Sequence, residues 1–326
     1  MKPFEYVRAG SAKEAAELLA ATKGAMLKAS GTDLLDRMKS FIDTPSRVVS
    51  LSGASGLNAI AAEGGVTRIG ALVTLTQLAE KLAEGPLAAL GHAAGEAATP
   101  QIRNVATVGG NLCQRPRCWY YRLGEVSCLK KGGKECPAIK GDNRYHAIFE
   151  TQPCPIVHPS NLSGPVVAYG ATIHVQGSKG TRDIPAAEFF TLPKTDMTRE
   201  NLLERDEVLV AISIPSWEGA RSAYLEGREK ESFDWSLVNA TVILRMDGTT
   251  CREARIVLGS VAPTPWRAPA AEKKLAGKKI DEKVAAEAAE SAFEGAKPLS
   301  GNGYKVKMGR TIAKRAILAA AGLWKE

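Results

Sequence analysis

Five of the six cysteines in this chain lie between positions 113 and 154. Such a density predicts one site rather than scattered buried thiols. Disulfides are typical of small secreted domains, whereas this chain has 326 residues and no basic-then-apolar segment at its N-terminus. We therefore favour a bound iron–sulfur cluster, with structural zinc as the second interpretation and disulfides or free thiols as the third.

The spacing of the cysteines bears on the choice between the two metals. Structural zinc sites usually contain paired cysteines with two to four other residues between them. Here only Cys113 and Cys118, with four residues between them, are that close. An iron–sulfur cluster needs four thiolates but tolerates irregular loops between them. Basic residues in "RPRC" and "CLKKGGKEC" would offset the negative charge of such a cluster. Cys251 lies in a predicted strand, where we expect an ordinary buried thiol.

Two turns rich in small residues form a second candidate site. "KASGTDL" (28–34) lies between a predicted strand and a predicted helix, and "TVGGN" (107–111) has two adjacent glycines. Small side chains let backbone N–H groups approach an anion, and glycine also permits positive φ. Taken alone, each turn is more typical of a plain chain reversal, the first capped by Thr32 or Asp33. Neither a G-x-G-x-x-G motif nor a P-loop occurs in the sequence.

The four histidines do not form a ligand set by spacing. His146 and His158 flank Cys154, so a role beside a metal ligand is open to both. A buried histidine with a purely structural role is the commoner case. No Ser-His-Asp or nucleophile-elbow pattern accompanies them.

The elements that must position these residues are readable in outline. Strand-like and helical patterns alternate before residue 100, and strands return between 165 and 215. Alternation over 222–248 and 251–268 predicts an antiparallel sheet with a turn at Asp247-Gly248, followed by helices around 281–295 and 306–325. Residues 112–160 have little periodicity and are too long for a bare loop. Something other than hydrophobic packing should therefore hold this segment. Separately, we place a domain boundary near residue 218.

Composition excludes several classes of partner. The chain is 44% hydrophobic and contains no apolar run long enough to span a membrane, so we expect no membrane insertion. Its net charge of +8 is spread along the chain without a basic stripe interleaved with aromatic residues. We expect no nucleic acid, and instead a solvated surface or a face for an acidic partner or anionic cofactor.

With these motifs in place, the chain resembles the FAD-binding (medium) subunit of the xanthine oxidase family of molybdenum hydroxylases. "ASGTDL" (29–34) is similar to the family's "AGGTDL" turn, and "QIRNVATVGGNL" (101–112) matches a family motif completely. "IGALVTLTQLA" (69–79) and "YKVKMGRTIAKRAIL" (304–318) also look like family segments. The resemblance covers nearly the whole chain. It implies an α+β fold, with a vanillyl-alcohol-oxidase (PCMH) type FAD-binding domain of two subdomains over 1–218. A smaller α+β domain, similar to that of CO dehydrogenase flavoproteins, would follow over 219–326.

The resemblance also implies which residues would bind FAD. The pyrophosphate would lie on the two turns, and Ile102 and Val210 would line the isoalloxazine. The full implied set is Lys28, Ala29, Ser30, Gly31, Thr32, Asp33, Leu34, Ile102, Thr107, Gly109, Gly110, Asn111, Gln114, Asn161, Val210 and Lys230. Two positions depart from the family pattern: Asn161 stands where Asp is frequent, and Glu226 stands where a lysine is usual.

A cysteine-rich insertion at about 113–158 separates this chain from most of the family. It is similar to the [4Fe-4S]-binding loop of periplasmic-type aldehyde oxidoreductases, which implies four ligands, Cys118, Cys128, Cys136 and Cys154. It also resembles the loop of 4-hydroxybenzoyl-CoA reductase, whose first cysteine would match Cys113. The fourth would fall at Tyr145, which favours the first pattern and leaves Cys113 as a reserve ligand.

The function implied is that of an electron-transfer subunit with FAD and a [4Fe-4S] cluster. Its partners would be a molybdenum large subunit, a [2Fe-2S] small subunit and an external electron acceptor. We expect no acid–base residue for substrate chemistry on this chain. One alternative is a 4-hydroxybenzoyl-CoA-reductase-like subunit with reversed electron flow, and another is a zinc-stabilised binding module. The chain would be cytoplasmic, or periplasmic by co-export with a signal-bearing partner.

Overall fold

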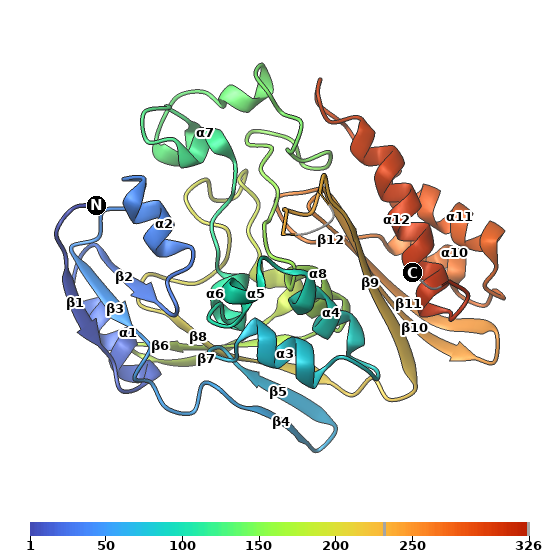
Figure 1. The fold of residues 1–326 in the computed structure, drawn as a ribbon, viewed down its shortest axis with the longest axis horizontal. Helices are drawn as coiled ribbons and strands as arrows, with labels where there is room; N and C mark the ends of the chain where they lie inside the picture. The colour runs from blue at the N-terminus through green and yellow to red at the C-terminus, as the bar shows by residue number, and fades with distance from the viewer. Residues whose placement is uncertain (231–232, 325–326) are drawn as a thin grey trace.

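A computed structural model describes residues 1–230 and 233–324, which are built around three β-sheets (Figure 1). The first sheet is parallel, with strand order β1-β3-β2, formed by Glu5–Arg8, Arg47–Ser50 and Ala25–Lys28. Helix α1 (Ala12–Ala21) begins at Ser11, whose hydroxyl caps the Glu14 N–H, and it buries Ala15, Ala16 and Leu19 against this sheet. Helix α2 (Leu34–Lys39) follows β2 directly.

The second sheet is antiparallel and has the order β4-β5-β8-β6-β7. Its strands are Ile60–Glu63, Val66–Gly70, Val208–Pro215, Thr172–Gly177 and Gly180–Pro185. The associated helices are α3 (Leu75–Lys81), α4 (Ala88–Glu96), α5 (Pro100–Arg103), α6 (Val108–Leu112), α8 (Ser163–Ala168) and α9 (Ala186–Phe189). Thr74 begins α3 with a reciprocal capping box to Gln77, and Thr107 caps α6 through the Gly110 N–H. These caps fix where "TVGGN" enters its short helix.

The third sheet is antiparallel, with the order β12-β11-β10-β9. Its strands are Trp266–Arg267, Thr250–Gly259, Val238–Asp247 and Ala220–Gly227. The turn predicted at Asp247-Gly248 is confirmed, since Gly248 has a φ of +56° between β10 and β11. Helices α10 (Pro269–Leu275), α11 (Glu282–Ala292) and α12 (Tyr304–Ala320) cover one face (Figure 1). Residue 325 of the expected final helix lies outside the described residues.

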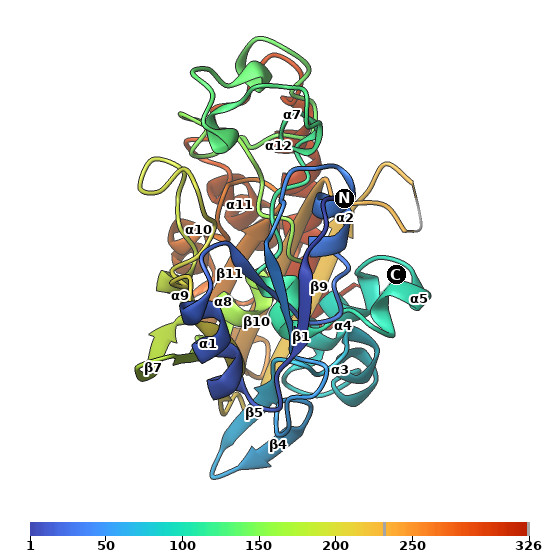
Figure 2. The same ribbon diagram turned by 90° about the vertical axis from the view of Figure 1, so that its left-hand side faces the viewer.

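The cysteine-rich insertion stands beyond the sheets, between the N-terminal sheet and α12 (Figures 1 and 2). It contains helix α7 (Trp119–Arg122) and single 3₁₀ turns at Leu129–Lys131 and Pro137–Ile139. The C-terminal region anchors the later part of the insertion. Asn302 Nδ2 donates to the carbonyls of His146 and Ala147, each at 3.0 Å. Polar contacts therefore anchor the segment, as its composition predicts.

Among the described helices, none combines the length and the apolar character needed to cross a membrane.

Candidate functional site

The two small-residue turns meet at one cavity of about 260 Å³. Loop 28–34 lines this cavity, and so do residues of α6 and of the start of the insertion. The predicted residues that line it are Lys28, Ala29, Ser30, Gly31, Thr32, Asp33, Leu34, Gly109, Gly110 and Gln114. The cavity is also lined by residues at the start of β8 and just before it, namely Leu203, Glu204, Glu207 and Leu209. Sequence motifs more than seventy positions apart thus share one concave surface.

Glycine is needed in the two turns for different structural reasons. Gly31 has a φ of +93°, and a Cβ there would lie 3.0 Å from Leu35 Cδ1 and from Lys28 Cε. Gly109 is helical, and a Cβ on it would lie 3.0 Å from the Ala71 Cβ. Of the two options open from the sequence, "TVGGN" therefore needs close backbone approach, and it does not use positive φ.

The Asp33 side chain does not cap helix α2. Its Oδ1 accepts from Arg122 Nη2 at 2.7 Å and pairs with Arg117 Nη2 at 3.1 Å, while Oδ2 accepts from the Arg115 N–H at 3.0 Å. Arg37 Nε completes the set at 3.1 Å. Burial raises the pKa of this carboxyl, but the guanidinium groups outweigh burial and hold the pKa below its usual range. Asp33 therefore stands at the N-cap position of α2 without a side-chain cap hydrogen bond, because its carboxylate pairs with guanidinium groups instead.

The remaining predicted flavin residues do not line this cavity. Thr107 caps α6, and Asn111 Oδ1 accepts from the Ser160 hydroxyl at 2.6 Å. Ile102 is 41% exposed on α5, and Lys230 is exposed beside a separate cavity next to β9. Val210 packs with α1 and Leu51, while its neighbour Leu209 lines the cavity.

Asn161 and Glu226, the two departures from the family pattern, are in direct contact. Asn161 Nδ2 donates to Glu226 Oε2 at 3.0 Å and to the Tyr224 hydroxyl at 3.1 Å. Tyr224 in turn donates to Glu226 Oε2 at 2.5 Å, and Arg228 pairs with the other carboxylate oxygen. Burial is the main reason that the pKa of Glu226 is raised. The two positions therefore have to be considered as a pair.

The insertion brings its four predicted cysteine ligands near one another. Burial, and the neighbouring thiols of Cys136 and Cys128, raise the pKa of Cys118 to about 11. The hydrogen bond between Cys136 and Cys154 lowers the pKa of Cys136 to about 7. These mutual effects require the thiols to be within interaction range. Among residues 1–230 and 233–324, however, no three His, Cys, Asp or Glu side chains form a group that could hold a metal ion.

The other two cysteines lie elsewhere. Cys113 ends helix α6 and lines the first cavity, where burial raises its pKa to about 12. No described contact joins it to the other insertion cysteines. Cys251 is fully buried in β11, which confirms the expectation of an ordinary buried thiol.

Sequence reasoning assigned the basic residues of "RPRC" and "CLKKGGKEC" to compensating the charge of a cluster, and missed that they pair with carboxylates elsewhere in the chain. Arg115, Arg117 and Arg122 converge on loop 28–34, and Lys130 Nζ pairs with the buried Glu200 at 2.6 Å. The signal available in the sequence is the run "QRPRCWYYR", whose three arginines can each form charge-assisted hydrogen bonds to a carboxylate.

Comparisons with known proteins agree with this arrangement. The FAD binding domain in molybdopterin dehydrogenase matches residues 2–217, and the CO dehydrogenase flavoprotein C-terminal domain matches residues 222–320. The aldehyde oxidoreductase FAD-binding subunit PaoB of Escherichia coli (strain K12) is 34% identical over 98% of this chain and 99% of its own. The carbon monoxide dehydrogenase medium chain of Hydrogenophaga pseudoflava is 30% identical, covering 97% of this chain and 96% of its own.

Solved structures give the same result for the fold. A carbon monoxide dehydrogenase chain from Hydrogenophaga pseudoflava superimposes with a TM-score of 0.78 at 28% identity, covering 100% of both chains. A chain of quinoline 2-oxidoreductase from Pseudomonas putida 86 gives a TM-score of 0.76 at 27% identity, covering 99% of this chain and 100% of its own. The fold expected from the resemblance is confirmed, and the chain belongs to the family of FAD-binding flavoprotein subunits of molybdenum hydroxylases.

Proposed function

We propose that this chain is the electron-transfer subunit of a molybdenum-dependent dehydrogenase for aldehydes or aromatic substrates. It would take electrons from a [2Fe-2S] subunit, which receives them from a molybdenum subunit, and pass them to an external acceptor. When bound, FAD would supply the chemistry of accepting electrons one at a time from a [2Fe-2S] donor and releasing them singly or in pairs. The observation that carries the proposal is the meeting of 28–34 and α6 at one cavity, beside an insertion that gathers four cysteines.

The cavity fits the pyrophosphate end of FAD. Its walls carry backbone from the small residues Ala29, Ser30 and Gly31, and Gly109 approaches Ala71 so closely that a side chain would close the gap. Such backbone-lined concavities bind phosphate oxygens through N–H groups. The chain's own residues thus bind and orient the cofactor, and the insertion covers one side of it.

The insertion supplies four thiols for a [4Fe-4S] cluster, those of Cys118, Cys128, Cys136 and Cys154. Their irregular spacing along the chain supports the cluster over the zinc-stabilised binding module, because structural zinc sites usually contain closely spaced cysteine pairs whereas a cluster tolerates irregular loops between its ligands.

Analysis of the purified chain tests the proposal. We expect about one FAD, four irons and four sulfides per chain, with the visible absorbance of both groups. Zinc at one equivalent without iron or sulfide contradicts the cluster and supports the binding module. The direction of electron flow is tested separately, because a cluster potential well above that of the flavin argues against a reductase that feeds electrons toward molybdenum.

A further inference from the structure

Two buried histidines flank Cys154, and only one of them reaches a cysteine. His146 Nε2 lies 3.2 Å from Cys118 Sγ, within hydrogen-bonding range of sulfur. His158 instead accepts from the Ser160 N–H at Nδ1 and packs edge-on against Phe190, with ring centroids 4.8 Å apart. Both side chains are 3% exposed, so burial does not explain the difference.

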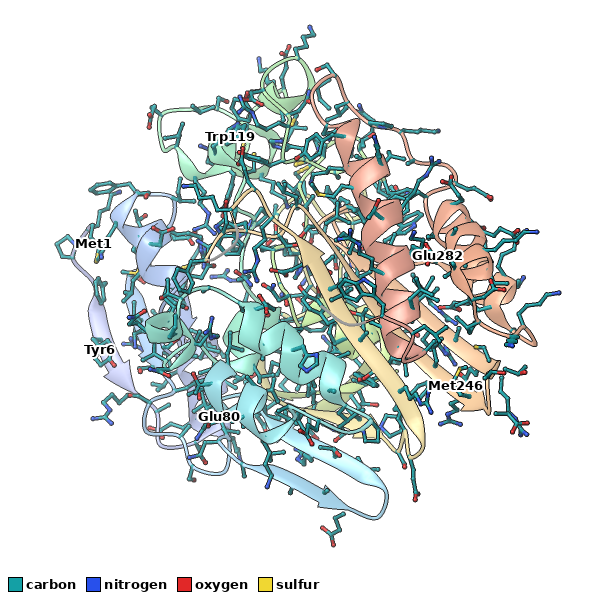
Figure 3. The ribbon with its side chains drawn as sticks, turned by 45° about the vertical axis from the view of Figure 1, so that its right-hand side comes forward. Met1, Tyr6, Glu80, Trp119, Met246 and Glu282 are labelled. Atoms are coloured by element: carbon teal, nitrogen blue, oxygen red, sulfur yellow. The ribbon has the colours of Figure 1, made fainter. Side chains whose placement is uncertain are left out.

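The backbone and the aromatic neighbours hold the His146 ring in this position. The backbone N–H of His146 donates to the Asn143 carbonyl at 3.0 Å, and the backbone carbonyl of His146 accepts from Asn302 Nδ2 at 3.0 Å. The ring meets Trp119 edge-on at 5.9 Å (Trp119 is labelled in Figure 3). Trp119 directly follows Cys118, so the sulfur and the imidazole are fixed by the same local packing.

The direction of this hydrogen bond follows from the chemistry of a ligated cysteine. A cysteine that binds iron is a thiolate and can only accept, so Nε2 must carry the proton. His146 Nδ1 is buried without a hydrogen-bond partner among the described residues, which leaves it as the unprotonated nitrogen of a neutral ring. A doubly protonated ring would also donate from Nε2, so the N–H···S bond exists in either state.

We propose that His146 is a positioning residue that raises the reduction potential of the cluster by donating an N–H···S hydrogen bond to Cys118. This inference rests on the proposed function, because it requires the cluster to be ligated by Cys118. Reduction adds negative charge that spreads onto the ligating sulfurs, and the positive end of an N–H dipole stabilises that charge. Hydrogen bonds to the sulfurs are among the features that set cluster potentials.

Redox titration of the whole chain, monitored by EPR, tests the inference. His146→Leu removes the donor, and we expect its cluster to be about tenfold harder to reduce, a potential about 59 mV lower for one electron. His146→Gln keeps an amide N–H at a similar reach and should restore most of the difference. His158→Leu is the matched control, equally buried but without a cysteine contact, and should leave the potential unchanged.

A full cluster with the wild-type potential in His146→Leu overturns the inference, as does an equal shift in His158→Leu. If the variants lose iron, a measurement on the wild-type chain still tests the hydrogen bond. With ¹⁵N-labelled histidine, pulsed EPR of the reduced protein should show one weakly coupled imidazole nitrogen, and its absence contradicts the hydrogen bond. A wild-type chain without iron and sulfide refutes the proposed function itself, a result distinct from a loaded cluster that is insensitive to His146.

Discussion

Asp33 and Arg122, from the N-terminal region and from the cysteine insertion, form a largely buried ion pair with 2.7 Å between Oδ1 and Nη2. Asp33 also lines the cavity that we assign to FAD, and Arg122 ends the short helix that follows Cys118. One carboxylate thus connects the two proposed redox sites. Arg117, adjacent to Cys118, shares the same oxygen at 3.1 Å.

Removing this carboxylate charge should destabilise the junction. Asp33→Asn leaves buried guanidinium groups without their counter-ion, and we expect a loss of about 3 kcal/mol in unfolding free energy. Asp36→Asn is the matched control, because Asp36 pairs with Arg122 at 3.0 Å but is 54% exposed. It should cost less than about 1 kcal/mol. Urea unfolding measures both, and equal effects would show that burial of the pair is unimportant.

Gly31 should be required for FAD content rather than only for stability. In Gly31→Ala the methyl group would meet Leu35 and Lys28 at 3.0 Å beside the cavity, so flavin per chain should fall several-fold. Gly85→Ala is the control, since Gly85 has a similar φ of +84° with open space around it. Both variants should lose about 1 kcal/mol from backbone strain. Normal flavin content in Gly31→Ala contradicts the assignment of this turn.

The cysteines should divide into two groups by iron content. Serine at position 118, 128, 136 or 154 removes a thiolate ligand, so each single variant should retain well under half of the wild-type iron. Cys113→Ser and Cys251→Ser should retain all of it, because Cys113 lines the other cavity and Cys251 is buried in β11. Iron loss in Cys113→Ser with full retention in Cys118→Ser would assign the reserve ligand instead.

Asn161 and Glu226 should be energetically coupled. Asn161→Asp places a second carboxylate 3 Å from a buried one, and Glu226→Lys sets a lysine beside Arg228, so each single change should cost about 2 kcal/mol. The double variant creates an ion pair and should recover much of this loss, with a coupling energy of about 1–3 kcal/mol. Simple additivity in a double-mutant cycle would mean that the contact carries no energy.

Lys305 should make stability depend on pH. Its Nζ donates to the carbonyls of Tyr145 and Ser260 at 3.0 and 2.9 Å, and burial lowers its pKa from 10.5 to about 7. Between these values the unfolded chain binds a proton that the folded chain does not, so unfolding free energy rises with pH. The gain is up to about 1.4 kcal/mol per unit.

Urea unfolding between pH 7 and pH 10 measures this slope. Lys305→Met should flatten it, whereas Lys307→Met, at an exposed position on the same helix, should leave it intact. A wild-type slope that persists in Lys305→Met assigns the pH dependence to another group.

The sequence by itself determined the parts of this protein that depend on local patterns. Alternation over 222–248 and 251–268 predicts the β10–β11 hairpin and its Gly248 turn, because side-chain period and turn chemistry are properties of neighbouring residues. The sequence likewise marks the two small-residue turns and the five cysteines between 113 and 154 as candidate sites.

Only the tertiary structure decided which of these residues meet. It turned Asp33 from the expected helix cap toward Arg122, placed His146 rather than His158 beside Cys118, and put Cys113 on the cavity wall. These contacts join residues far apart in the chain, or choose between near-equivalent neighbours, so no periodicity encodes them. They follow from how the insertion packs between the N-terminal sheet and α12, where buried charges and polar groups must find partners.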